Sequence, residues 1–231
     1  MGTTFTWFNI PVIYYLLVLA LILPRIPYIG KLFNIINTLI HEFGHAFMAL
    51  LLQGRVYSIE IFGDTSGSAT TQTKNKTSSF LVSISGYLFA SSFAWLSFYL
   101  LSAGLHQYYI IGLSALFLVI LLLWVRNRFG IIWILTFCVL NSFFIFYLKS
   151  DIFTYLIATF YATIILVESL FSTLILLYLS IFKHKESGDA LNLQKITHIP
   201  AFFWAAIFAA YAIFIVYQIY QQFTPYFQIR F

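Results

Sequence analysis

The sequence predicts an all-α polytopic membrane protein of about seven transmembrane helices, with a small β-hairpin after the second. Hydrophobic residues make up 61% of the 231 residues and charged residues only 8%, whereas a water-soluble domain carries about 25% charged residues. So few charges could not cover a water-facing surface, and lipid must cover it instead. Seven apolar stretches are long enough, or nearly so, to cross a bilayer. We expect residues 1–231 to form one membrane-embedded domain.

The expected spans follow one another with short polar connections. Residues 8–23 form the first, which stops at Pro24-Arg25-Ile26-Pro27, and residues 28–52 form the second. The remaining five cover residues 78–101, 107–125, 131–148, 152–182 and 199–222.

Two segments between these spans differ in character from the rest. Residues 53–76 begin with the alternating run Val56–Ile61 and continue into the turn-rich run Gly63–Gly67, a pattern that predicts a β-hairpin associated with the membrane. Residues 183–199 are polar, with Gly188-Asp189 ahead of a short amphipathic stretch, and are expected on the cytoplasmic side.

Lysine and arginine counts orient the chain, because cytoplasmic loops carry an excess of both. The side that holds the N-terminus has eight of the twelve, namely Arg55, Lys74, Lys76, Arg126, Arg128, Lys183, Lys185 and Lys195. This predicts a cytoplasmic N-terminus and a cytoplasmic hairpin. The basic residues are scattered and form no patch, so no nucleic-acid partner is expected.

The second expected span contains His41-Glu42-Phe43-Gly44-His45, the pattern H-E-x-x-H. Residues four apart share a face of a helix, so both imidazoles can converge on one metal ion. Glu42 stands between them, where it can act as the catalytic base on the hydrolytic water. Three ionisable groups inside an apolar span are costly, which favours metal binding over a merely structural polar cluster.

The chain resembles the site-2 protease family of intramembrane zinc metallopeptidases, and specifically its compact bacterial "B-like" branch. The residues that carry the resemblance are His41-Glu42-x-x-His45-Ala46, Asp64-Thr65-Ser66-Gly67, Gly86-Tyr87, Arg126-Asn127-x-Phe129-Gly130, Gly188-Asp189-Ala190, Thr197-His198-Ile199-Pro200 and Trp204. The resemblance implies a metallopeptidase-like domain with Zn²⁺ as cofactor that hydrolyses a peptide bond in or near the bilayer. It further implies a bacterial cytoplasmic membrane, a membrane-protein or membrane-proximal peptide substrate, and room for a regulatory membrane partner.

The third zinc ligand is left open by the sequence. Well-studied members supply an Asp from an Asn-x-x-Pro-x-x-Asp-Gly stretch, which this chain lacks. Asp189 is favoured because it matches the acidic position of the branch's Ser-Asp-Ala pattern, although its segment must dip inward to reach the histidines. Glu168 is the runner-up because it lies at membrane depth in the sixth span. Asp151 lies at the opposite membrane face and carries little weight; Asn127, water or no third ligand complete the alternatives.

Four residues are candidates for substrate binding: Asp64, Ser66 and Gly67 in the hairpin turn, and Asn127. A protease binds its substrate as an extended strand, because a helix shields its peptide bonds with its own hydrogen bonds. The hairpin edge could pair with such a strand. The turn residues fit ordinary turn chemistry equally well, since Asp and Gly supply local hydrogen bonds and positive φ angles.

Two other classes of function stay open. The chain could be a catalytically inactive metal-binding membrane scaffold, in which case Glu42 would be dispensable. It could instead be a metal or solute carrier whose polar cluster lines a path. The absence of any sign of inverted repeats in the sequence disfavours the carrier.

Overall fold

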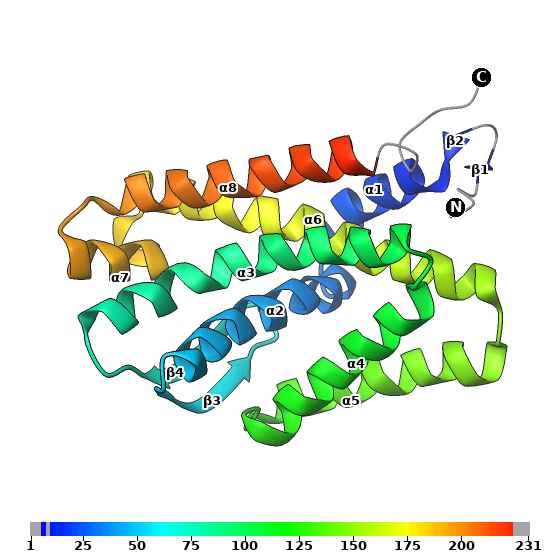
Figure 1. Cartoon of the computed structure of the whole chain (residues 1–231), viewed down its shortest axis with the longest axis horizontal. Coiled ribbons are helices and arrows are strands. Elements are labelled where there is room, and N and C mark those ends of the chain that lie inside the picture. Colours follow the sequence, from blue (N-terminus) through cyan, green and yellow to red (C-terminus); the bar gives the residue numbers. More distant parts are fainter. Residues whose placement is uncertain (1–5, 8–9, 224–231) are drawn as a thin grey trace.

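The computed structural model describes residues 6–7 and 10–223 of the chain. The molecule is mostly helical, and its long helices run side by side (Figure 1). Its helical elements are α1 (Val12–Ile22), the 3-10 turn η1 (Leu23–Arg25), α2 (Ile29–Leu51), α3 (Lys76–Ser102), α4 (His106–Leu123), α5 (Arg128–Ser142), the π-helical η2 (Phe143–Leu148), α6 (Asp151–Phe182), η3 (His184–Glu186), α7 (Gly188–Thr197) and α8 (Ala201–Gln222). Its strands are β1 (Thr6–Trp7), β2 (Ile10–Pro11), β3 (Arg55–Ile61) and β4 (Gly67–Gln72).

The prediction of an all-α membrane protein with a small hairpin is confirmed. Among the described residues, five helices are long and apolar enough to span a bilayer: α3, α4, α5 with η2, α6 and α8. The segments α1–η1 and α2 pass the same test together, but they are bent by 100° at the break between them. Counting this bent pair as one span gives six.

The first expected span is shorter than the sequence suggested. Of residues 8–23, residues 8–9 lie outside the described part of the chain, and only the 11 residues of α1 are α-helical. Eleven residues extend about 16 Å, roughly half the thickness of a bilayer core. Pro24 lies within η1 and Tyr28 has a φ of 65°, so the backbone cannot continue as one helix into α2.

Helix α6 is the centre of the bundle. The stretch 161–169 is buried around its whole circumference, because α1, α2, α3, α4 and α8 all pack against the helix. Beside it, α2 and α3 approach closely where two glycines meet. A Cβ atom on Gly44 would lie 3.2 Å from the Cα of Gly86. Small residues of this kind let membrane helices come into backbone contact.

The hairpin is fastened to the bundle along one edge. Strands β3 and β4 pair antiparallel, and the outer edge of β3 is occupied because the Ile59 N–H donates to the Trp124 carbonyl at 2.9 Å. The side-chain amide of Asn127 donates to the Ile61 carbonyl and accepts from the Ile61 N–H. The opposite edge, that of β4, has no strand partner among the described residues.

The polar segment 183–199 forms η3 and α7, and it folds back onto the bundle. Ala190 and Leu193 of α7 are buried in a small apolar cluster with Leu176 of α6 and with residues of α8, namely Ala201, Ala205 and Phe208. This packing draws the first turn of α7 toward α2 and α3. The apolar face of α7 therefore holds this segment against the bundle, which brings Asp189 within reach of the histidines.

Candidate metal centre

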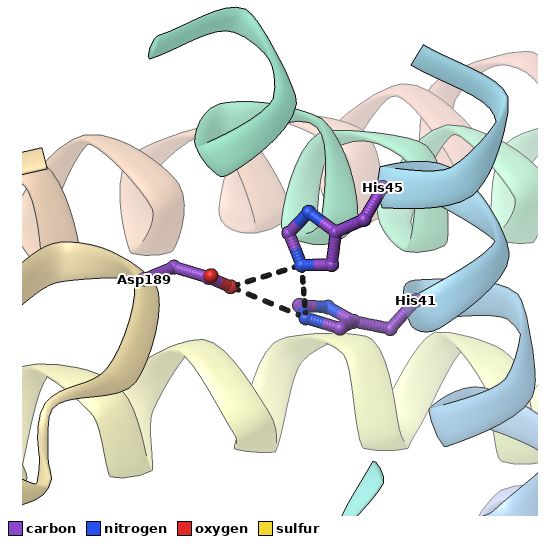
Figure 2. Close-up of side chains that lie close together, drawn as sticks. All are labelled: His41, His45 and Asp189. Atoms are coloured by element: carbon purple, nitrogen blue, oxygen red, sulfur yellow. Dashed lines mark hydrogen bonds and ion pairs between the residues drawn. The ribbon is translucent and has the colours of Figure 1, made fainter. Parts of the chain in front are cut away.

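Helix α2 presents His41 and His45 on one face, as the four-residue spacing predicted. Their Nε2 atoms lie 3.1 Å apart, and the ring planes are nearly perpendicular. His45 is 7% exposed. Figure 2 shows both rings pointing from α2 toward the start of α7.

Asp189, in the first turn of α7, completes the group. Its Oδ2 atom lies 3.3 Å from His41 Nε2 and 3.2 Å from His45 Nε2. Burial alone would raise the pKa of the Asp189 carboxyl, but the two adjacent imidazoles outweigh it and hold that pKa well below its ordinary value. Of the acids considered from sequence, the structure brings Asp189 to the histidines.

The spacing of these three atoms fits a metal ion. Zinc binds His nitrogen and carboxylate oxygen at about 2.0–2.2 Å in tetrahedral geometry, which places neighbouring ligand atoms roughly 3.3–3.6 Å apart. The observed separations are 3.1–3.3 Å. Two neutral nitrogens and one carboxylate are also a donor set that suits zinc. The residues present therefore fit the cofactor that the sequence predicted.

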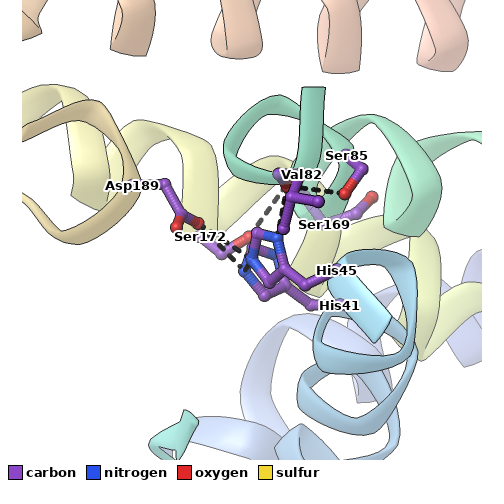
Figure 3. Close-up of polar contacts among 7 residues, drawn as sticks. All are labelled: His41, His45, Val82, Ser85, Ser169, Ser172 and Asp189. Atoms are coloured by element: carbon purple, nitrogen blue, oxygen red, sulfur yellow. Dashed lines mark hydrogen bonds and ion pairs between the residues drawn. The ribbon is translucent and has the colours of Figure 1, made fainter. Parts of the chain in front are cut away.

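The orientation of His45 is set by main-chain chemistry. Its Nδ1 atom lies 2.7 Å from the carbonyl oxygen of Val82 on α3. A carbonyl can only accept, so Nδ1 carries the hydrogen and the lone pair of Nε2 is left for a metal. The Ser85 hydroxyl donates to the same carbonyl at 2.6 Å (Figure 3).

Gly86 of α3 lies directly against the two imidazoles. A Cβ atom at this position would lie 2.5 Å from His45 Nε2 and 2.7 Å from His41 Nε2. Neither nitrogen could keep its place beside a larger residue. The next residue, Tyr87, packs edge-to-face on the His41 ring with the centroids 4.4 Å apart.

Glu42 lies between the histidines and the hairpin. Its side chain is buried, at 7% exposed, and it contacts the first residue of β4. A Cβ atom on Gly67 would lie 2.9 Å from Glu42 Oε1 and 2.6 Å from the Cγ2 of Thr38. The Thr38 hydroxyl also donates to the Thr65 carbonyl at 2.9 Å, which ties the hairpin turn to α2.

A cleft with a volume of about 820 Å³ opens beside this group. It lies between β4 and α7, with α2 and α3 supplying further walls. Many of the side chains that line it are small and polar, namely Asn37, Thr38, Ser66, Ser68, Thr71, Thr73, Ser79, Ser83, Ser172 and Asn192. Ser172 comes from α6, where its hydroxyl donates to the Ser169 carbonyl (Figure 3).

The other acidic candidates have different partners. Glu168 forms an ion pair with Arg25 of η1, and the Arg25 guanidinium lies 4.4 Å over the ring of Phe171. Asp151 pairs with His106 Nε2 at 2.7 Å. Neither acid joins the histidine group.

The candidate substrate-binding residues separate into two sets. Ser66 and Gly67 line the cleft, whereas Asp64 and Asn127 do not. Asp64 accepts hydrogen bonds from the Ser66 hydroxyl at 2.6 Å and from the Ser66 N–H at 3.0 Å, and these bonds lower the pKa of its exposed carboxyl. Asn127 is engaged by the backbone of β3.

Sequence reasoning missed several residues around the group. Val82 contributes its main-chain carbonyl, and every residue type has one, so the sequence could not indicate this role. Thr38 has no distinguishing feature in the sequence, because its role depends on the hydrogen bond to Thr65 in the hairpin turn. Gly86 and Tyr87 were among the residues of the family resemblance, but the sequence assigned them no function. A glycine within an apolar helix could have indicated that another helix packs closely there.

The helices and this group together define an integral membrane protein with a His-His-Asp cluster beside a polar cleft. The Peptidase M50B-like family model matches residues 12–219, so the chain belongs to that peptidase family. The match includes both histidines, Glu42 and Asp189, and it bears out the resemblance stated from the sequence. No curated protein and no solved structure gave a significant match.

Proposed function

We propose that the chain is an intramembrane zinc metalloprotease that hydrolyses a peptide bond in or near the bilayer. The observation that carries this proposal is the convergence of His41 Nε2, His45 Nε2 and Asp189 Oδ2 within 3.1–3.3 Å of one another. It occurs in a member of a peptidase family, with Glu42 one residue from His41 and a cleft alongside. A catalytically inactive metal-binding scaffold would require neither Glu42 beside the histidines nor a cleft next to the metal ligands.

His41, His45 and Asp189 would hold the zinc ion, which when bound supplies Lewis-acid polarisation of the scissile carbonyl. Glu42 takes a proton from the attacking water and returns it to the leaving amine, so its carboxylate ends the cycle as it began. The Val82 carbonyl keeps His45 in the tautomer that leaves Nε2 free. Glu42 is buried but lines the cleft, so its carboxylate can reach a water there while most of its surface is shielded from solvent.

The edge of β4 is suited to bind the substrate as an added strand. Ile59 and Ile61 turn their backbone groups away from β4, toward Trp124 and Asn127. Their partners in the antiparallel register are Ala69 and Gly67. Directly opposite residues of this type share no hydrogen bond, so the N–H and C=O of Gly67 and Ala69 also point away from the hairpin. Both residues line the cleft. The Ala69 N–H already donates to the Glu42 carboxylate, so an extended peptide could take the bonds that remain, those of Gly67 and of the Ala69 carbonyl.

The substrate is proposed to be a membrane protein, or a membrane-proximal peptide, that enters from the hairpin end. Most lysines and arginines lie in the hairpin, the α4–α5 connection and the η3–α7 segment, which favours a cytoplasmic location for that end. Figure 1 places the start of α1 at the opposite end of the bundle. If α1 and α2 form one bent span, the start of α1 and the hairpin face opposite sides of the membrane. A cytoplasmic hairpin then places the start of α1 on the outer side. The cytoplasmic N-terminus, the bacterial cytoplasmic membrane and a regulatory partner stay predictions.

Hydrolysis by the purified, zinc-loaded chain tests this function. The probe is a set of single-span model peptides, each with a quenched fluorophore pair across one membrane boundary. We expect Glu42→Gln to slow cleavage by roughly 10²–10⁴-fold while zinc content is unchanged. Glu60→Gln, in β3 and outside the cleft lining, is the matched control and should cleave normally.

Two results would overturn the proposal. Cleavage by Glu42→Gln at the wild-type rate would remove the base from the mechanism. A zinc-loaded wild type that cleaves no peptide would favour the inactive scaffold, and zinc flux into liposomes would favour the carrier.

A further inference from the structure

Asn37 is a buried polar residue of the cleft that nothing in the mechanism above uses. It lies on α2 one turn before His41 and lines the same cleft. Its side chain is 6% exposed. Its Oδ1 atom has no hydrogen-bond partner among the described residues. Buried polar atoms without a partner are rare in proteins, and this one lies in a side chain that lines an open cleft, where a water or a ligand can reach it.

Asn37 is next in sequence to Thr38, which lies against the first residue of β4. Gly67, the first residue of β4, lies against Thr38 and Glu42 of α2. From there β4 runs to Gln72, whose carbonyl oxygen lies beside Gly54, just after the end of α2. The strand edge therefore accompanies the cleft from Glu42 toward the hairpin end, and no further strand residue continues past Gly67 in the other direction.

Thr38 cannot readily supply a donor to a peptide beside Gly67. The Thr38 hydroxyl already donates to Thr65 of the turn. An extended substrate that runs past Glu42 into the bilayer would leave the strand edge there, with unpaired peptide groups in an apolar setting. Asn37 lies where such a peptide would need a partner.

We propose that Asn37 is a substrate-positioning residue, whose side-chain amide binds a backbone peptide group on the bilayer side of the scissile bond. The proposal rests on the protease function above and names a contact that the β4 edge cannot make. An asparagine amide offers an acceptor and a donor, which match the N–H and C=O of a peptide group. Recognition of this kind is independent of the substrate's side chains.

The spacing on α2 gives the distance from the reaction. Four residues of α-helix rise about 6 Å, and an extended chain advances about 3.3 Å per residue. The contacted peptide group therefore lies about two residues from the bond that is cleaved.

The chain supplies a matched control one turn earlier. Asn34 is on the same helix, and its Oδ1 atom also lacks a hydrogen-bond partner among the described residues. Asn34 does not line the cleft. A replacement at each site removes the same chemistry from the same helix, and only one of them touches the proposed substrate path.

The experiment compares Asn37→Leu and Asn34→Leu in the zinc-loaded chain, with the single-span model peptides as substrate. For Asn37→Leu we expect KM to rise by about tenfold, equivalent to the loss of one good hydrogen bond to a buried peptide group. Zinc content and kcat should stay close to wild type. The melting temperature should not fall, because leucine removes a buried amide oxygen that has no hydrogen-bond partner among the described residues. Asn34→Leu should leave KM unchanged.

Other outcomes would overturn this role for Asn37. A wild-type KM together with a lower melting temperature would assign Asn37 to the structure, through a buried water. Equal rises in KM for both variants would show a general effect on α2. If the wild type cleaves nothing, the protease proposal fails by itself. The Kd of the same peptides for the zinc-loaded chain, with and without Asn37→Leu, then still decides whether Asn37 binds peptide.

Discussion

Two clusters of ionisable side chains lie within the helical bundle, and they are built on opposite principles. In the pair of Arg25 and Glu168, opposite charges neutralise each other and the ring of Phe171 covers the guanidinium. In the metal centre, two imidazole nitrogens and a carboxylate oxygen converge beside an open cleft. The pair is complete in itself. The metal centre gathers two imidazoles and a carboxylate that can each offer a lone pair to a cation.

The glycine beside the histidines gives the largest expected effect. Gly86→Ala places a Cβ atom within 2.5–2.7 Å of both metal-binding nitrogens, so at least one imidazole must leave its position. We expect zinc affinity to fall by at least about 100-fold, beyond the loss typical for residues that merely support a ligand. The measurement is zinc titration of the purified chain in detergent.

Gly112→Ala is the matched control, since a Cβ at that helical position meets nothing within 4 Å. It should keep zinc and stabilise α4 slightly, by up to about 1 kcal/mol. Normal zinc binding by Gly86→Ala would mean that the histidines do not lie as described.

The ion pair should respond in stability and not in metal binding. Arg25→Met leaves the Glu168 carboxylate buried without its partner, which should lower the free energy of unfolding by on the order of 1–3 kcal/mol. A second change, Glu168→Leu, should restore part of that loss. Thermal unfolding in detergent measures both, and zinc content should not change in either variant.

The exposed pair of Lys183 and Glu186, 3.4 Å apart, serves as the comparison for this prediction. Lys183→Met should change stability by less than about 0.5 kcal/mol, because surface ion pairs contribute little. Loss of zinc in Arg25→Met would contradict the separation of the two clusters.

The fastening of the hairpin gives the smallest expected effect. Thr38→Val removes the hydroxyl that donates to the Thr65 carbonyl but keeps the shape of the side chain. The turn loses about 1 kcal/mol of stabilisation, which corresponds to roughly a fivefold rise in KM if β4 binds the substrate. Thr163→Val is the control, because the Thr163 hydroxyl bonds only to carbonyls of its own helix. A KM that is unchanged in Thr38→Val would separate the hairpin from substrate binding.

The parts of the fold that the sequence predicted are those encoded locally. Apolar length predicts the long helices, the alternation in residues 56–61 predicts β3, and the four-residue spacing predicts that His41 and His45 share a face. Each of these depends on residues close together in the chain.

The remaining features depend on contacts between distant segments. Asp189 reaches the histidines because Ala190 and Leu193 pack α7 onto α8, which no local pattern reveals. Glu168 has the membrane depth of a ligand, but Arg25, 143 residues away, is its partner. The 100° bend between α1 and α2 likewise turns two expected spans into a bent pair that is long and apolar enough to span a bilayer only when both segments are taken together.

The central claim is that Asp189, and not Glu168, holds zinc together with His41 and His45. Zinc content per folded chain, measured for the wild type, Asp189→Asn and Glu168→Gln, tests it most directly. We predict about one zinc ion per chain in the wild type and in Glu168→Gln, and a loss in Asp189→Asn. Retention of zinc by Asp189→Asn with loss in Glu168→Gln, or a folded wild type that takes up no zinc, would contradict the claim.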